Sequence, residues 1–387
     1  MTESLFEAGR RLMLASQQSG RSMLALVAEM IRLRYSAGRM GMSEYLDFRL
    51  HETDLSLAEK RHFAGWRAQG VLDEILVDDY SRFLSLDKIS MYGLLAAYGL
   101  PFPAIKAALR TRRPGSLRCL QTADELLNFL QEPGNLPIYA KPSMGAFGRG
   151  NALITGLEGD RIVFGNGTRQ SIVEFFGSVA DPRGLGWILQ EPLRSHAGIA
   201  ALCGEKISGV RAHTFLAPDG PRVTKAVLKI NVGQVDWDNF QHGASGNMLG
   251  AIDVATGVVT RVISGTGQEQ VVDPPHPVSG RELVGFEVPL WDQTKRLLSD
   301  AALAFPGYIC PGWDIAICDS GPRILEVNAF GDVDLSQHAY RRGFMDSQFN
   351  QLMSDRRLDR LLTARPRNHS KSPENHRWGI RRHHWRW

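Results

Sequence analysis

The sequence predicts an α+β protein, on three observations. Residues 1–85 carry apolar side chains at helical spacing, whereas the residues after them form short apolar runs joined by Gly, Pro and Asp turns, the pattern of antiparallel hairpins with a few interposed helices. The 387 residues are enough for one large domain or for two to three smaller ones. In residues 365–387, Pro, His, Arg and Trp occur without periodicity, which predicts a disordered tail.

The basic charge of the chain belongs to this tail. The whole sequence has a net charge of +4, and residues 365–387 hold six Arg and one Lys against one Glu, so the tail carries +6 and the rest −2. We therefore expect no nucleic acid partner for the folded body. The four Cys form no CxxC pair, and no segment offers the ~18 uninterrupted apolar residues of a membrane span. These features favour a cytoplasmic protein, and they leave its oligomeric state open.

Within the helical region 1–85, one segment has a clear apolar face. From Ser22 to Leu33 the apolar residues recur at helical spacing, and Glu29 and Arg32 lie elsewhere on the helix. A basic amphipathic helix of this kind can lie on a membrane surface. More often it packs on its own domain, and we expect the same here. The region is interpreted as a helical cap or a substrate-side element.

A Gly-rich loop follows two further predicted helices, one ending at Gly99 and one capped by Thr122. A short strand ends at Lys141-Pro142, glycines follow at 145, 148 and 150, and a second strand then begins. Such a loop lets backbone N–H groups approach phosphate oxygens closely. A flexible turn would explain the glycines equally well, but the lysine at the strand end favours a phosphate site.

The next predicted elements are a strand over 187–193, which breaks at a proline, and a hairpin over 207–230. That hairpin carries Arg211, His213, Lys225 and Lys229. His213, together with His242 and His276 in later loops, could accept a proton from an amine. Histidines in such positions are more often ordinary loop or core residues.

The segment Gly312–Asn328 reads as another hairpin, with turn residues at 319–322. Glu326 and Asn328 are two residues apart on one strand, so their side chains share a face, and the turn brings Asp314 back beside them. Two carboxylates and an amide oxygen are hard ligands that suit Mg²⁺. An edge hairpin with a solvated polar face is the alternative.

Taken in chain order, these motifs resemble the ATP-grasp superfamily. The resemblance runs from Asp87 to Gln337 and is greatest to the group named for its association with sugar-transfer genes, with some likeness to ligases that add glutamate to peptides. It implies two α+β subdomains that clasp ATP within residues 86–364. The subdomain with the Gly-rich loop would span about 121–193, and the metal-binding subdomain about 194–340.

The resemblance also implies a role for each matching residue. Lys88 and Lys141 would contact the nucleotide phosphates. Catalytic roles fall on Arg211, Lys229 and Asn239, of which Arg211 would stabilise the transferred phosphoryl group. The remaining implied roles are the loop over the triphosphate for Ser143, Gly145, Gly148 and Gly150, the adenine contact for Gln190 and Glu191, and the metal ligands for Asp314, Glu326 and Asn328.

Two features depart from the superfamily pattern. Its members usually carry an acidic residue after the adenine-binding segment to hold the ribose, but residues 192–198 contain no carboxylate, so His196 is the candidate there. In addition, many relatives begin with a small α/β domain, whereas this chain begins with a short helical region.

The implied activity is an ATP-dependent carboxylate–amine ligase. A carboxylate would attack the γ-phosphoryl group of ATP, and an amine would displace phosphate from the acylphosphate, with two Mg²⁺ ions (or Mn²⁺) neutralising charge. The substrates would be small carboxylates and amines, and the sugar-linked resemblance suggests a role in polysaccharide or glycoconjugate modification. A kinase acting on a hydroxyl acceptor and a nucleotide-binding module without turnover remain alternatives.

Overall fold

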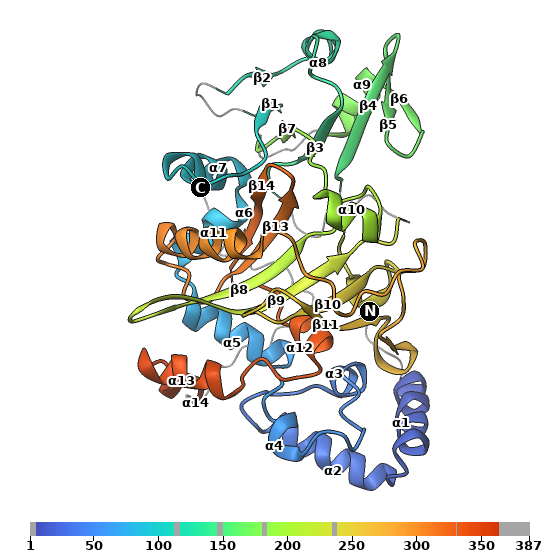
Figure 1. Cartoon of the computed structure of the whole chain (residues 1–387), viewed down its shortest axis with the longest axis vertical. Coiled ribbons are helices and arrows are strands. Elements are labelled where there is room, and N and C mark those ends of the chain that lie inside the picture. Colours follow the sequence, from blue (N-terminus) through green and yellow to red (C-terminus); the bar gives the residue numbers. More distant parts are fainter. Residues whose placement is uncertain are drawn as a thin grey trace.

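The computed structural model describes residues 5–111, 117–144, 150–179, 184–233, 238–329 and 331–363. It confirms the α+β class: two mixed layers of helix and sheet follow a helical N-terminal part (Figure 1). Each sheet has seven strands over the described residues. The tail 365–387 and the loop glycines Gly145 and Gly148 lie outside the described residues.

The first sheet has the order β2-β1-β7-β3-β4-β5-β6. Its pairs are antiparallel except for β1 with β2. The predicted hairpin around the Gly-rich loop is confirmed, because β3 and β4 pair directly on either side of it. The strands are β1 (Ile105–Leu109), β2 (Cys119–Leu120), β3 (Ile138–Pro142), β4 (Ala152–Glu158), β5 (Arg161–Phe164), β6 (Arg169–Ser171) and β7 (Trp187–Gln190).

Two helices pack on this sheet, α8 (Ala123–Gln131) and α9 (Ile172–Ser178). Each begins with a capping box, in which the side chain of Thr122 or Ser171 accepts the third amide and the glutamate three residues later reaches back. Leu126 and Phe129 of α8 and Phe175 of α9 enter a shared apolar core with the strands. This lobe stands at one end of the molecule (Figure 1).

The second sheet has the order β12-β11-β10-β9-β8-β13-β14, antiparallel throughout. The hairpin expected over 312–328 is its edge pair, β13 with β14. The strands are β8 (Val210–Ala217), β9 (Gly220–Ile230), β10 (Met248–Ile252), β11 (Val259–Ser264), β12 (Val271–Val272), β13 (Gly312–Cys318) and β14 (Gly321–Asn328).

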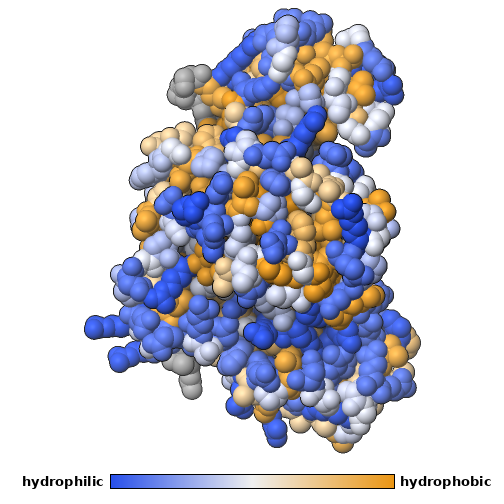
Figure 2. Space-filling view, viewed as in Figure 1, coloured by the Kyte–Doolittle hydropathy of each residue, from blue (hydrophilic) through white to orange (hydrophobic). Residues whose placement is uncertain are grey.

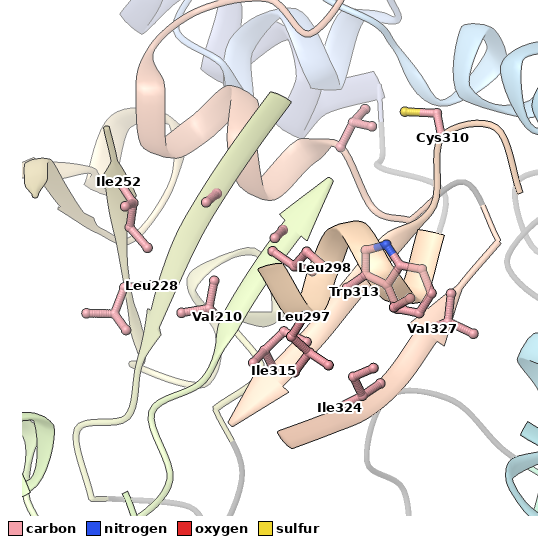
Figure 3. Close-up of a cluster of buried hydrophobic side chains, with 14 of the residues drawn as sticks. Val210, Leu228, Ile252, Leu297, Leu298, Cys310, Trp313, Ile315, Ile324 and Val327 are labelled. Atoms are coloured by element: carbon pink, nitrogen blue, oxygen red, sulfur yellow. The ribbon is translucent and has the colours of Figure 1, made fainter. Parts of the chain in front are cut away.

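Helices cover both faces of this sheet. On one face α11 (Trp291–Ala304) brings Leu297 and Leu298 against Trp313 and Ile315 of β13 (Figure 3). On the other face α12 (Asp334–Tyr340) packs by Leu335 on β9 and β10. Side chains alternate along a strand, so Asp314, between Trp313 and Ile315, points to the opposite face of the sheet, on which α12 packs. That face carries the polar residues of the candidate site.

The helices that precede the first strand divide into two parts. Helices α1 (Leu5–Ser19), α2 (Met23–Arg34), α3 (Met42–Asp47) and α4 (Leu57–Lys60) form an apolar cluster of their own. Helices α5 (Trp66–Leu76), α6 (Asp79–Leu86) and α7 (Lys88–Ala97) bury their apolar residues in the core of the second sheet. The Gln337 side chain of α12 holds the linker between the two parts, because it accepts from the Ala64 amide at 2.7 Å and donates to its carbonyl at 3.0 Å.

The amphipathic segment predicted at 22–33 is helix α2, and only one of its faces packs inward. Leu26 and Leu33 are buried, whereas Leu24, Val27 and Ile31 are exposed. The expectation that the helix packs on its own domain is therefore correct for one face, and the other face has no cover among the described residues.

The chain continues through the short helices α10 (Ala197–Cys203), α13 (Ser347–Asp355) and α14 (Asp359–Thr363), with 3₁₀ turns η1 (Gln241–Gly243) and η2 (Gly267–Glu269). None of the described helices combines the length and apolarity that crossing a membrane requires. The proposed boundaries at 85, 121, 193 and 340 stay predictions, although β1 and β2 place the start of the first sheet ahead of residue 121.

Candidate functional site

The polar residues expected on three separate segments lie opposite one another in the second sheet. Arg211 on β8 pairs with Asp314 on β13, which pairs in turn with Glu326 on β14. Directly opposed residues in an antiparallel sheet point to the same face. The three side chains therefore line one stripe across the edge of the sheet, on the face that also carries Lys229.

Asp314 is the centre of a buried ion-pair network. Its carboxylate accepts from Arg211 Nε at 3.0 Å and from Nη2 at 2.9 Å, and Lys229 Nζ lies 2.9 Å from Oδ1. Lys229 also donates to Asp238 at 2.9 Å. Burial alone would raise the pKa of Asp314, but the charges of Arg211 and Lys229 outweigh it and hold that pKa well below its usual value. Asp314 is thus a carboxylate at any ordinary pH.

Arg211 has one donor left over. Burial would lower the pKa of its guanidinium, yet the Asp314 carboxylate raises it, so the group stays charged. Its Nη1 is buried and has no hydrogen-bond partner among the described residues. An unsatisfied buried donor on a cation is costly unless a ligand completes it, and a phosphate oxygen fits that need.

Glu326 and Asn328 lie on the next strand, β14, and make fewer and longer polar contacts than Asp314 does. The Asn328 amide nitrogen donates to Asp314 Oδ2 at 3.2 Å, and Glu326 lies 3.9 Å from Lys88 Nζ with about a quarter of its side chain exposed. The described residues contain no group of three His, Cys, Asp or Glu side chains placed to hold a metal. A Mg²⁺ ion here would need the Asn328 oxygen, water or phosphate to complete the ligands of Asp314 and Glu326, which is the mixture that Mg²⁺ favours.

Two lysines approach the same place from the other sheet and from α7. Lys141 at the end of β3 is buried and donates to the Tyr92 hydroxyl at 2.9 Å. Burial and the neighbouring charge of Lys88 lower the pKa of Lys141 to about 7, against the opposing effect of Glu326 and Asp314. Lys88, also buried, begins α7. The site thus lies where the two sheets meet, with Lys88 and Lys141 on one side and the ion-paired stripe of Arg211, Asp314 and Glu326 on the other.

The residues expected to hold adenine lie at the end of β7, and those expected to close over the phosphates lie beside the Gly-rich loop. Gln190 ends β7, and its buried Oε1 has no partner among the described residues, while its contact with adenine stays a prediction. The Glu191 carboxylate instead accepts from the Ala104 amide at 3.0 Å and fixes the segment after the strand. Ser143 donates to the Leu185 carbonyl at 2.6 Å. Gly150 has a positive φ of 83° and lies against Trp187.

Two predicted site residues serve local structure here. The Asn239 side chain accepts from the Gln241 amide at 3.1 Å, within its own loop. His196 caps α10 by accepting from the Gly198 amide, and its other nitrogen lies 3.8 Å from Asp319 in the β13–β14 turn. Their proposed contacts with acceptor and ribose stay predictions.

The structure adds two residues that the sequence did not single out for the site, Tyr92 and Asp238, and it shows the surroundings of His213, which the sequence named as a possible proton acceptor. Tyr92 follows Lys88 by one helical turn, a spacing that could have revealed it, and it holds Lys141 while donating to the Leu325 carbonyl. Asp238 precedes Asn239 and fixes Lys229. His213 lies two residues from Arg211; both ring nitrogens are buried without a partner among the described residues, and burial with the Arg211 charge lowers its pKa to about 3.

The comparisons with solved structures return ATP-grasp enzymes at low identity. N5-carboxyaminoimidazole ribonucleotide synthetase from Thermotoga maritima is 10% identical over 65% of this chain and 43% of its own, with a TM-score of 0.34. The ATP-grasp ligase PsnB with its minimal precursor is 16% identical over 73% and 63%, with a TM-score of 0.39. D-alanine–D-alanine ligase from Bacillus anthracis is 12% identical over 76% and 73%, with a TM-score of 0.38. This chain therefore spans less than two thirds of the first two proteins, and no curated protein matches it.

The comparison with protein families is decisive. The family described as "Sugar-transfer associated ATP-grasp" matches residues 76–351, well over half of the chain, and covers both sheets and every residue of the candidate site. The resemblance inferred from Lys88, Lys141 and the Gly312–Asn328 hairpin is confirmed, and this protein belongs to the sugar-transfer associated ATP-grasp family.

Proposed function

We propose that this protein is an ATP-dependent ligase that activates a carboxylate as an acylphosphate and joins it to an amine. Membership in an ATP-grasp family supports the general part, an ATP-dependent ligase. The observation that carries the proposal for this site is the buried Arg211, which Asp314 holds through Nε and Nη2 while Nη1 has no partner among the described residues, and Lys88 and Lys141 lie near the same carboxylates. Such a set of cations binds a triphosphate, and the adjacent carboxylates suit its metal ions.

The chemistry needs positioned charge more than a nucleophile on the protein. A carboxylate oxygen of the substrate forms a bond to the γ-phosphorus, and the bond from that phosphorus to the bridging oxygen of ADP breaks. The amine nitrogen then attacks the acyl carbon, phosphate leaves, and the amine loses a proton. Bound Mg²⁺ would neutralise charge that develops on the phosphates. Arg211 and Lys229 would hold the transferred group, since Asp314 keeps both in place and charged.

His213 is a candidate acceptor for the proton of the amine. Its pKa of about 3 keeps the ring neutral at pH 7 but also makes it a weak base, so His213 could take this proton only if an anionic ligand raised that pKa. It lies on the same strand face as Arg211, so it is close to the site without being one of its ion pairs. Its edge contact with Phe344, at a ring separation of 5.0 Å, fixes the orientation of the ring.

A screen for phosphate release tests the activity. Purified protein with Mg-ATP is offered amino acids, sugar acids, amino sugars and short peptides, because the family name points to sugar transfer and PsnB was solved with a precursor peptide. A ligase releases inorganic phosphate and gives a product with the combined mass of both substrates less water. A kinase leaves phosphate on its acceptor, and ATP binding without ADP formation with any pair would indicate a binding module.

The match to the "sugar-transfer associated" family motivates one finer proposal, that the carboxylate or the amine is carried by a sugar. The screen decides this as well, since sugar acids or amino sugars should then give the fastest phosphate release. Equally fast phosphate release with plain amino acids would contradict the proposal that a substrate is carried by a sugar, and it would leave the proposed ligase activity standing.

A further inference from the structure

We propose that helix α2 docks on an anionic membrane surface and makes this protein a peripheral membrane protein. The starting observation is an apolar stripe with no cover among the described residues. It consists of Leu24, Val27, Ala28 and Ile31, with Tyr35 at the C-terminal cap. Leu24 is 83% exposed and Tyr35 is 86% exposed. Val27 and Ala28 lie three and four positions after Leu24, and Ile31 and Tyr35 continue the same spacing, so all five lie on one side of the helix within an arc of about 100°.

The opposite side of α2 is already used by the fold. Leu26 and Leu33 are buried in the cluster of the N-terminal helices. Half a turn therefore separates the residues that hold the helix in place from the exposed stripe. Leu26 and Leu33 already provide the core contacts of this helix, so the exposed stripe is not needed to pack α2 on its own domain.

Charge along the helix completes the pattern. Arg32 lies on one flank of the stripe and Arg34 on the other, at about 100° per residue. Neither forms an ion pair with a described residue; Arg34 donates only to the Arg39 carbonyl, at 3.2 Å. The acidic residue of α2, Glu29, points inward, where Arg21, Lys60 and Tyr45 bond it. Solvent therefore meets apolar residues bordered by arginines.

The positive charge is local to the stripe. Elsewhere in the N-terminal helices arginines are paired with carboxylates, Arg10 with Glu7, Arg11 with Asp47 and Arg21 with Glu29. Residues 1–65 contain eight Arg and one Lys against eight Asp and Glu, a net charge of +1. In Figure 2 the N-terminal region forms the lower end of the molecule, where apolar and hydrophilic surface are interspersed. An apolar stripe flanked by arginines is the arrangement of helices that lie in the headgroup region of an anionic bilayer.

The same charge argues against two other occupants of the stripe. A second copy of the chain would bring two sets of Arg32, Arg34 and Arg39 together. The tail at 365–387 carries +6 and would be repelled by Arg32 and Arg34, which border the stripe. An anionic lipid surface satisfies the apolar and the charged residues at once.

Docking in this way would leave the ATP site accessible. The stripe lies on the N-terminal helices, and the lobe with the Gly-rich loop stands at the far end of the molecule (Figure 1). The lobe would project away from the bilayer and could still move against the second sheet.

The test is flotation of the full-length protein with vesicles of phosphatidylcholine alone or of phosphatidylcholine mixed with phosphatidylglycerol. We expect binding to the mixed vesicles, weaker binding at high salt, and little binding to phosphatidylcholine alone. The double substitution Leu24→Ser with Ile31→Ser should weaken binding by about tenfold or more, and Arg32→Ala by about fivefold. Val173→Ser on α9, an exposed apolar residue of the other lobe, is the matched control and should bind as the wild type does.

Three results would overturn the proposal. The wild-type protein could fail to float with the mixed vesicles. The Leu24→Ser and Ile31→Ser protein could bind as well as the wild type, which would assign membrane binding to another surface such as residues 364–387. Light scattering could show a dimer of the wild-type protein that the same double substitution dissociates, which would assign the stripe to a second copy.

Discussion

Arg211 and Asp314 lie directly opposite each other on β8 and β13 and form a two-point ion pair, with Nε–Oδ1 and Nη2–Oδ2 distances of 3.0 and 2.9 Å. Both side chains are buried, and Lys229 adds a second cation to the same carboxylate. A buried ion pair of this kind costs little only while it is complete. Asp314 therefore supports the fold of the site as well as its proposed chemistry.

The substitution Asp314→Asn should destabilise the protein and also abolish turnover. It removes the charge that balances Arg211 and Lys229, and loss of one partner of a buried pair typically costs about 3–5 kcal/mol. Chemical denaturation in the absence of nucleotide measures the loss of stability, and ADP formation measures activity. The double variant Asp314→Asn with Arg211→Met should recover part of the stability and none of the activity. Unchanged stability of Asp314→Asn would show that the pair contributes nothing to the fold.

Glu326→Ala should abolish turnover and leave stability nearly unchanged. Glu326 is partly exposed, and its nearest cation, Lys88, is 3.9 Å away, so the free energy of unfolding should change by less than about 1 kcal/mol. Denaturation curves and ADP formation are again the measurements. Asp300→Ala, an exposed acid on α11, is the control and should be active. A Glu326→Ala protein that still turns over Mg-ATP would contradict the assignment of Glu326 as a metal ligand.

Tyr92→Phe should raise the KM for ATP by several-fold with a smaller effect on kcat. The hydroxyl accepts from Lys141 and donates to the Leu325 carbonyl, so its loss frees the lysine that is expected to contact phosphate. One such hydrogen bond to a charged group is worth about 1.5–3 kcal/mol at most. Tyr98→Phe changes an exposed tyrosine beyond the end of the same helix and should have normal kinetics. Equal KM values in the two variants would rule out a positioning role for Tyr92.

Local patterns in the sequence predicted the elements of the site but not how they meet. Alternation along Gly312–Asn328 and the turn between its strands sufficed to place Asp314 beside Glu326. The register between β8 and β13, which sets Arg211 against Asp314, joins residues about a hundred positions apart and leaves no local trace. The spacing of Tyr92, one turn after Lys88, places it on the same side of the helix, but that spacing does not reveal its partners on β3 and β14. For α2, the helical spacing of apolar residues predicted a single apolar face. The helix has one buried and one exposed apolar side, which the spacing cannot distinguish because it does not show which side a neighbouring helix covers.

Acid should destabilise this protein from about pH 6 downward, in part through His338 on α12. Burial lowers the pKa of His338 from 6.5 to about 3, so the folded state keeps the ring neutral while the unfolded chain takes up a proton. Stability is therefore unaffected above pH 6.5 and falls between pH 6.5 and 3 by about 1.4 kcal/mol per pH unit for this group. His213 acts in the same direction. Denaturation at several pH values should give a shallower slope for His338→Leu, and an unchanged slope would show that the ring is protonated in the folded state.

ATP affinity should fall as the pH rises above 7, because of Lys141. Burial and Lys88 lower the pKa of Lys141 to about 7 when no phosphate is present. A bound triphosphate would raise that pKa toward or above its ordinary value of 10.5, so ATP binding above pH 7 must take up a proton and loses up to about tenfold in affinity per pH unit. Below pH 7 Lys141 is already charged before ATP binds, so it adds no further pH dependence to the affinity for ATP. Calorimetry in two buffers of different ionisation enthalpy should show uptake of most of a proton at about pH 8. Lys141→Arg keeps its charge over this range, so it serves as the control and should bind without this uptake. If the wild-type protein and Lys141→Arg show the same pH dependence, Lys141 is not the group that becomes charged when ATP binds.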